Sequence, residues 1–242
     1  MHTPILTTRV APTCNPRTIP RSMFRHVPNS ITAGRLVLAI VFFGLLALYQ
    51  HGGTGDPWRL NTAFLVYVVA LFTDFLDGYL ARRWKVEGAF GRVVDPLVDK
   101  VLVLGSFIFF AGKNFIIPAS AVSLGATGVV KTVSGVAPGM VVLLLTRELL
   151  VTSLRGSSES SGQAFGAAFS GKLKMVFQSV TILVILVYVN YLDRHSNLDV
   201  QRYGRYFRDF CIWATVIITV LSGLLYVRRA VALYRSSRVT DN

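Results

Sequence analysis

Residues 73–100 read TDFLDGYLARRWKVEGAFGRVVDPLVDK, and they hold four aspartates in a largely apolar part of the chain. Apolar runs border the stretch at residues 63–73 and 101–111, so each aspartate pair falls where a transmembrane helix would run. A carboxylate at membrane depth costs roughly 2.5–3.5 kcal/mol. We therefore expect a bound cation to gather these side chains, which are Asp74, Asp77, Asp95 and Asp99.

The spacing of the aspartates predicts a shared metal site. The first two are three residues apart and the last two are four apart, so on helices each pair projects from one face. Two such faces turned toward each other would gather carboxylate oxygens, which are the ligands that Mg²⁺ prefers. The alternative is a pair of buried ion pairs that hold helices together, for instance Asp77 with Arg82 and Asp99 with Lys100.

The residues between the two pairs suit a phosphorylated ligand. Gly78 and Gly91 have no side chain that would block the close approach of a ligand or a backbone. The connection also carries a short basic run that could contact phosphate groups, formed by Arg82, Arg83, Lys85 and Arg92.

Composition places the chain among membrane proteins. Of its 242 residues 52% are hydrophobic and only 15% are charged, and apolar runs of membrane length recur. The net charge of +13 lies mostly at the ends of these runs, which favours anionic membrane lipid as a partner and not nucleic acid. Cys14 and Cys211 lack metal-ligand spacing, and we interpret both as ordinary free thiols.

The fold class that we expect is an all-α, polytopic membrane protein with about six transmembrane helices. Their expected ranges are 31–49, 60–81, 92–110, 139–154, 173–191 and 210–227. We expect residues 113–138 to form an external loop and residues 193–208 to form an amphipathic segment at the membrane interface.

Three regions follow from this pattern. Residues 1–26 are rich in proline and arginine and predict a disordered basic cytoplasmic tail, residues 27–230 a membrane-embedded domain, and residues 231–242 a basic C-terminal tail. With six spans, fifteen Lys and Arg residues fall on the side of the termini and seven on the other side. This bias predicts that both termini and the aspartate hairpin face the cytoplasm, although the arginines at 202–208 oppose it.

The aspartate stretch resembles the signature of CDP-alcohol phosphotransferases at every position: Asp74-x2-Asp77-Gly78-x2-Ala81-Arg82-x8-Gly91-x3-Asp95-x3-Asp99. The resemblance implies an integral enzyme of phospholipid synthesis in the cell inner membrane, dependent on Mg²⁺ or Mn²⁺, that displaces CMP from a CDP-linked lipid or alcohol. It implies that the four aspartates hold two metal ions, that Asp99 is the base on the acceptor hydroxyl, and that Gly78, Arg82 and Gly91 contact the CDP-lipid.

A second resemblance lies at the start of the first helix. Pro28 to Arg35 is similar to the pattern P-N-x-x-T-x-x-R that begins many bacterial members of the family. It implies that Asn29, Thr32 and Arg35 also bind the CDP-lipid. Alternatively, Arg35 extends to the lipid headgroups and has no role in the site.

The acceptor alcohol is suggested by basic residues further along the chain. Four cations near the ends of two helices suit a phosphorylated acceptor: Arg147, Arg155, Lys172 and Lys174. Alternatively they anchor the helices by charge, with Arg147 paired to Glu148.

Residues 147–155 (R-E-x2-V-T-x-L-R) and 171–178 (G-K-x-K-x3-Q) are similar to segments of bacterial phosphatidylglycerophosphate synthases. The resemblance implies CDP-diacylglycerol and sn-glycerol 3-phosphate as substrates, and a homodimer. The alternative within the family is a cardiolipin synthase that uses phosphatidylglycerol as acceptor.

Other protein classes fit parts of the pattern. Polyprenyl-type membrane transferases also use Mg²⁺ and aspartate pairs, but usually on well-separated helices. A cation channel or transporter would explain intramembrane aspartates but not Arg82 or the later basic cluster. A purely structural protein would leave the four carboxylates unexplained.

Overall fold

The computed structural model describes residues 27–52, 57–84, 89–117, 131–160 and 169–240. Within these ranges the chain forms six α-helices and no strand. They are α1 Val27–Leu48, α2 Pro57–Trp84, α3 Ala89–Phe110, α4 Pro138–Ser160, α5 Phe169–Val187 and α6 Leu198–Thr240. A short 3-10 turn, Lys113–Phe115, follows α3, and a π-helical turn, Tyr188–Leu192, ends α5. The prediction of an all-α fold is confirmed.

The first five helices lie where hydropathy predicts them, within a few residues at each end. One local difference is at the start of α3, which begins at Ala89 and not at the predicted residue 92, so that Gly91 lies inside the helix. Pro96 also lies inside α3, in the half that carries the second aspartate pair.

The last helix is longer than the sequence predicts. The sequence predicts a separate interfacial segment at 193–208, a helix at 210–227 and a tail from 231, whereas α6 is one helix of 43 residues. Residues 198–209 contain no proline, and their arginines, tyrosines and aspartates are compatible with a helix, so it continues unbroken into the apolar stretch.

Several helices have the length and apolar composition that crossing a membrane requires. In the described parts of the chain, three helical segments are long and apolar enough to cross a membrane: Pro57–Leu76, Leu173–Leu192 and Leu198–Ala232. The apolar stretch Ala33–Leu48 in α1 is shorter. Large apolar side chains cover the outside of these helices, including Ile40, Leu65, Ile217 and Leu221, all more than half exposed. A surface of this kind belongs in lipid, and the protein is a multi-pass membrane protein.

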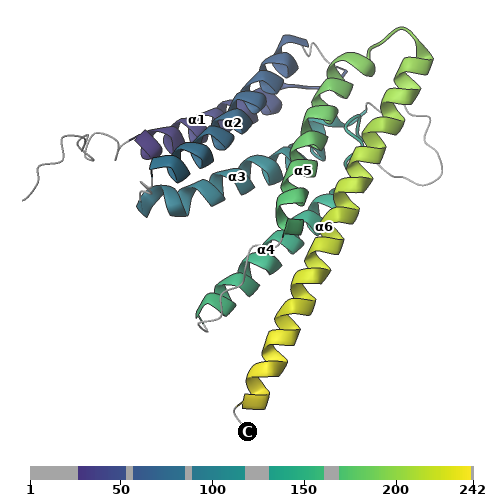
Figure 1. The fold of residues 1–242 in the computed structure, drawn as a ribbon. Coiled ribbons are helices and arrows are strands. Elements are labelled where there is room, and N and C mark those ends of the chain that lie inside the picture. Colours follow the sequence, from purple (N-terminus) through teal and green to yellow (C-terminus); the bar gives the residue numbers. More distant parts are fainter. Residues whose placement is uncertain (1–26, 53–56, 85–88, 118–130, 161–168, 241–242) are drawn as a thin grey trace, which may run out of the picture.

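The helices form two groups that meet along α5 (Figure 1). In the first group α1 packs against α2 and α3, and in the second α4 and α5 pack against α6. Contacts of α5 with α2 and α3, and of α4 with α3, join the groups. Aromatic side chains fill the first group, where the Phe42 and Tyr67 ring centroids lie 5.3 Å apart and both side chains are fully buried.

The part of the predicted external loop that the structure describes packs on the helix ends. Ile116 and Thr132 form an antiparallel bridge, and the Ser134 hydroxyl donates to the Phe110 carbonyl at 2.6 Å. The Asn114 amide donates to the Leu46 and Ala47 carbonyls at the end of α1. These bonds satisfy helix-terminal carbonyls that have no partner within their own helices.

Candidate active site

A buried arginine joins the first three helices at the predicted metal site. The Arg35 Nη1 of α1 lies 2.9 Å from Asp74 Oδ1 of α2 and 2.8 Å from Asp99 Oδ1 of α3. Its side chain is only 2% exposed, whereas the side chains of Asp74 and Asp99 are 44% and 21% exposed. The cation therefore lies beneath two carboxylates that remain accessible from outside.

This geometry overturns two of the structural alternatives. Arg35 does not extend to the headgroups, because its guanidinium is buried and pairs with two carboxylates there. Lys100 does not turn to Asp99: its ammonium donates to the Thr152 hydroxyl of α4 at 2.8 Å. Consecutive residues on a helix point in different directions, which explains why Asp99 and Lys100 contact different helices.

Several other predicted site residues lie on described helices, but their side chains fall outside the described part of the structure. Asp77, Gly78 and Arg82 belong to the last turns of α2, and Gly91 and Asp95 to the first turns of α3. Asn29 and Thr32 belong to the first turns of α1, and Lys172 to the start of α5. All four aspartates are thus carried by α2 and α3, as the spacing predicts.

The two described aspartates fit a divalent cation. One carboxylate oxygen of each aspartate contacts the same nitrogen of Arg35, so the two carboxylates are close enough to share a positive charge. Their hard oxygen donors suit Mg²⁺ or Mn²⁺. Among the described side chains, no group of three or more candidate ligands gathers. The side chains of Asp77 and Asp95 lie outside that set.

Apolar side chains flank this site on the outer surface of α2 and α3. Phe75 and Leu97 are 73% and 60% exposed, next in sequence to Asp74 and two residues from Asp99. Phe72 and Val101 continue the exposed apolar surface along each helix. The site therefore opens beside a surface that faces lipid.

A second cluster of charges lies between α4 and α5. The Arg147 Nη1 donates to Glu148 Oε2 at 3.0 Å, and the Lys174 ammonium pairs with the same carboxylate oxygen. Arg147 and Lys174 are both buried. Two of the predicted acceptor residues are thus brought together, and the predicted Arg147–Glu148 pair is confirmed.

Helix α6 completes this cluster with residues that the sequence analysis did not identify. The Arg147 Nη2 donates to the Ser222 hydroxyl at 2.5 Å, and the Arg155 Nη2 donates to the Tyr226 hydroxyl at 3.2 Å. Both guanidinium carbons lie 5.6 Å from the centroid of the Tyr226 ring, which is within cation–π range. The available signal was the spacing of hydroxyl residues in an apolar helix: Thr215, Thr219, Ser222 and Tyr226 share one helical face.

Lys100 connects the two clusters. It follows Asp99 on α3, and its ammonium bonds Thr152, whose hydroxyl in turn donates to the Glu148 carbonyl at 2.8 Å. The Glu148 carbonyl belongs to the backbone of α4, so Lys100 ties α3 to α4 one helical turn from the Glu148 side chain, and its charge acts on Lys174 of the basic cluster.

Comparison with known proteins assigns the chain to a family. The CDP-alcohol phosphatidyltransferase family matches residues 25–221. A Bacillus subtilis (strain 168) protein named CDP-diacylglycerol--glycerol-3-phosphate 3-phosphatidyltransferase is 28% identical over 208 residues, which cover 83% of this chain and 93% of the relative. A protein of the same name from Cereibacter sphaeroides is 30% identical over 66% of this chain and 63% of the relative.

A Mycobacterium tuberculosis (strain H37Rv) protein named "Probable phosphatidylglycerophosphate synthase" is 32% identical over 211 residues, or 87% of this chain and 84% of the relative. The matched residues include the aspartate stretch, Arg35 and the basic residues of the second cluster, whereas Ser222 and Tyr226 follow the matched range. The chain belongs to the CDP-alcohol phosphatidyltransferase family.

Proposed function

We propose that this protein transfers a phosphatidyl group from CDP-diacylglycerol to sn-glycerol 3-phosphate, releasing CMP and forming phosphatidylglycerophosphate. The observation that carries the proposal is the adjacency of two clusters: the accessible carboxylates of Asp74 and Asp99, and a basic cluster that Lys100 and Thr152 connect to them. The names of the relatives support the choice of substrates.

The proposed metal ligands are Asp74, Asp77, Asp95 and Asp99, which would hold two Mg²⁺ or Mn²⁺ ions. Bound divalent ions would neutralise the diphosphate and the departing CMP, which is the main requirement of phosphoryl transfer. Arg35 contributes a fixed positive charge behind Asp74 and Asp99 and holds their carboxylates in place.

The CDP-lipid would lie over the same helices. We assign its binding to residues near the ends of α1, α2 and α3: Asn29, Thr32, Gly78, Arg82 and Gly91. The side chain of Arg35 is buried beneath Asp74 and Asp99, so Arg35 would act on the CDP-lipid through these two carboxylates. The exposed apolar surface beside Asp74 leaves room for the acyl chains in the surrounding lipid.

The acceptor would bind on the other side of Asp99. Its phosphate is assigned to Arg147, Arg155, Lys172 and Lys174. The described cluster holds three cations and one carboxylate: Glu148 pairs with Arg147 and Lys174, and Arg155 donates to the Tyr226 hydroxyl. The cluster therefore keeps a positive excess, which suits an anionic acceptor. The acceptor hydroxyl would then reach Asp99, whose carboxylate takes the proton as the oxygen attacks the β-phosphorus of CDP-diacylglycerol and CMP leaves.

The surroundings of the site follow from charge. The excess of Lys and Arg on one side favours an inner-membrane protein whose active site and termini face the cytoplasm, with anionic lipid around it. The homodimer that we propose as the assembly rests on the family resemblance alone. A reporter fused after Asn242 should be cytoplasmic and one inserted at residues 52–55 external. Both reporters on one side would overturn the orientation.

The activity is tested with the purified full-length protein and radiolabelled CDP-diacylglycerol. CMP release that depends on glycerol 3-phosphate and yields a phosphorylated lipid supports the proposal. Faster release with phosphatidylglycerol would identify a cardiolipin synthase instead, and no release with either acceptor would reject both assignments.

A further inference from the structure

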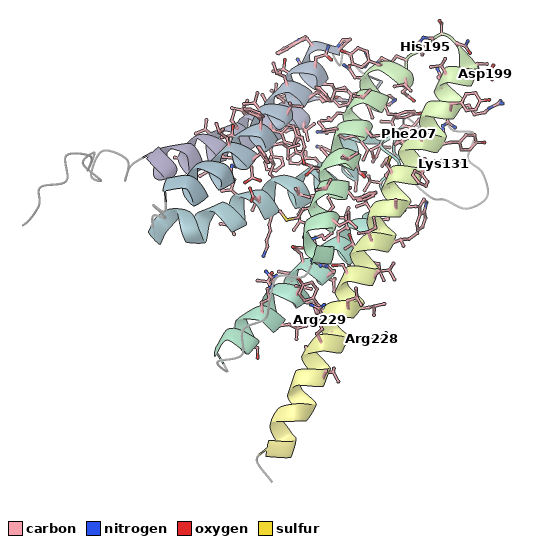
Figure 2. All side chains as sticks on the ribbon, viewed as in Figure 1. Lys131, His195, Asp199, Phe207, Arg228 and Arg229 are labelled. Carbon is pink, nitrogen blue, oxygen red and sulfur yellow. The ribbon has the colours of Figure 1, made fainter. Side chains whose placement is uncertain are left out.

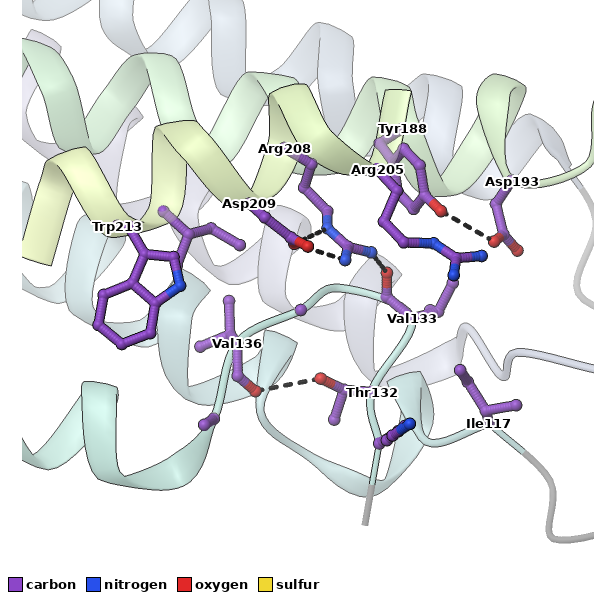
Figure 3. Close-up of a pocket in the computed structure, with 14 residues that line it drawn as sticks. Ile117, Thr132, Val133, Val136, Tyr188, Asp193, Arg205, Arg208, Asp209 and Trp213 are labelled. Atoms are coloured by element: carbon purple, nitrogen blue, oxygen red, sulfur yellow. Dashed lines mark hydrogen bonds and ion pairs between the residues drawn. The ribbon is translucent and has the colours of Figure 1, made fainter. Parts of the chain in front are cut away.

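A pocket of about 400 Å³ lies at the end of the helices opposite the aspartates (Figure 3). It is formed by the loop before α4, the turn after α5 and the first part of α6. By contrast, Arg35, Asp74 and Asp99 lie toward the start of α1, the end of α2 and the start of α3. The pocket is therefore separate from the proposed active site.

One buried arginine fixes the wall of this pocket. The Arg208 guanidinium lies 4.5 Å from the centroid of the Tyr188 ring, and its Nη1 donates to the Val133 carbonyl at 2.6 Å. Its Nε and Nη2 donate to Asp209 Oδ1 at 2.9 and 2.6 Å. These contacts hold the loop, the turn and α6 together, so the pocket is part of the packed structure.

Gly135 allows this approach. Its φ of +76° is a conformation that favours glycine, and a Cβ there would lie 2.8 Å from the Arg208 Nε. The absence of a side chain at Gly135 therefore allows the Arg208 guanidinium to pack against the loop backbone.

The charges of the lining favour an anion. Lys131, Arg205 and Arg208 supply three positive charges, against two negative charges from Asp193 and Asp209. Asp209 is paired with Arg208, and Asp193 accepts a hydrogen bond from the Tyr188 hydroxyl at 3.3 Å. Arg205 also bonds Tyr188 and is attracted by Asp193 and Asp209, so the lining as a whole keeps one positive charge in excess. The exposed Arg205 and Lys131 are the cations best placed to meet a ligand, and Figure 3 shows Arg205 extending toward the loop that carries Val133.

The same pocket has an apolar edge at the level of the membrane surface. Trp213 is 55% exposed on α6, and Tyr203, Tyr206 and Phe207 are exposed on the turns before it. Lys131 lines the pocket together with Arg205 and Arg208 of the first part of α6. Exposed aromatic residues of this kind gather at the headgroup level of a bilayer.

We propose that this pocket binds the phosphate of an anionic phospholipid from the membrane leaflet opposite the active site. Arg205 and Lys131 would contact the phosphate, and Ile212 and Trp213 would lie against the start of the acyl chains. Such binding needs neither the aspartates nor the basic cluster, so it is independent of the proposed reaction.

The test is a titration of the full-length protein in detergent with phosphatidylglycerol or phosphatidylcholine, read by native mass spectrometry. The wild type should bind phosphatidylglycerol in preference, and the double variant Lys131→Ala/Arg205→Ala should bind it roughly ten- to a hundredfold more weakly. Arg202→Ala is the matched control: it removes an exposed arginine of the same helix that does not line the pocket, and it should leave binding unchanged.

Three results would overturn the proposal. The first is equal weakening by Arg202→Ala, which would mean that only the general charge of this surface matters. The second is unchanged binding in the double variant. The third is displacement of the lipid by inorganic phosphate at a similar concentration, which would identify a site for free phosphate. Circular dichroism and an unchanged CMP release rate in the double variant would show that it is folded.

Discussion

Substituting Arg35 tests the arrangement at the centre of the candidate active site. Arg35→Met keeps an unbranched side chain but removes the charge that lies between Asp74 and Asp99. Removing one partner of a buried ion pair costs about 3–5 kcal/mol, because the other charge is left uncompensated. Asp74 is 44% exposed, so solvent screens part of this cost.

We therefore expect Arg35→Met to lower the free energy of unfolding by about 2–4 kcal/mol in the absence of divalent metal. For a chain of this length, 1 kcal/mol lowers Tm by about 2–4 °C, so the loss corresponds to roughly 4–16 °C. A divalent ion would replace the missing positive charge at the carboxylates. Mg²⁺ should thus raise the Tm of the variant by more than it raises that of the wild type.

The assay is thermal unfolding of the detergent-solubilised protein, followed by circular dichroism in EDTA and again in Mg²⁺. Arg228→Met provides a matched control, because Arg228 is an exposed arginine of α6 (Figure 2) and its loss should change stability by no more than about 0.5 kcal/mol. The reasoning is refuted if Arg35→Met melts within about 2 °C of the wild type in EDTA, or if Mg²⁺ raises both melting temperatures equally.

Three further variants test the site and its surroundings. Asp74→Asn should reduce CMP release by roughly a hundredfold or more while the protein stays folded, because charge stabilisation by a metal ion contributes several kcal/mol. Near-normal turnover of the variant would exclude Asp74 as a metal ligand. Arg155→Ala should raise the KM for glycerol 3-phosphate about ten- to a hundredfold and leave that for CDP-diacylglycerol nearly unchanged, and a change in both KM values would contradict its assignment to the acceptor. Burial lowers the pKa of His51, and the nearby Asp193 opposes this shift. The contribution of His51 to stability is therefore complete above its unfolded pKa near 6.5, and it is lost as the pH falls through the lower folded pKa. His51→Gln should therefore flatten the fall in Tm between pH 7 and pH 5, and an identical pH dependence in the two proteins would show that another group is responsible.

The helices and the aspartate pairs could be predicted because both depend on local sequence. Apolar runs determine α1 to α5, and spacings of three and four residues place each aspartate pair on one helical face. The full extent of α6 was not predictable in this way, because residues 198–209 mix arginine and aromatic residues as interfacial segments also do.

The partners of the buried cations depend on contacts between distant parts of the chain. Arg35 is 64 residues from Asp99, and Arg147 is 75 residues from Ser222. Local sequence patterns do not indicate which helices pack together. The sequence analysis therefore left two interpretations of Arg35 open and did not identify Ser222 or Tyr226 as residues of the site. The pocket around Arg208 was missed for the same reason, since three separate segments form it.

The exposed apolar side chains beside the aspartates also bear on how a lipid-linked substrate arrives. Moving one CH₂ group from an apolar phase into water costs about 0.8 kcal/mol, so pulling out a chain of about sixteen carbons would cost about 13 kcal/mol. Because Phe75 and Leu97 continue the hydrocarbon layer up to Asp74 and Asp99, such a substrate can diffuse sideways in the plane of the bilayer. Only its polar diphosphate then has to cross from the headgroup layer to the carboxylates, and the product can leave by the same lateral path.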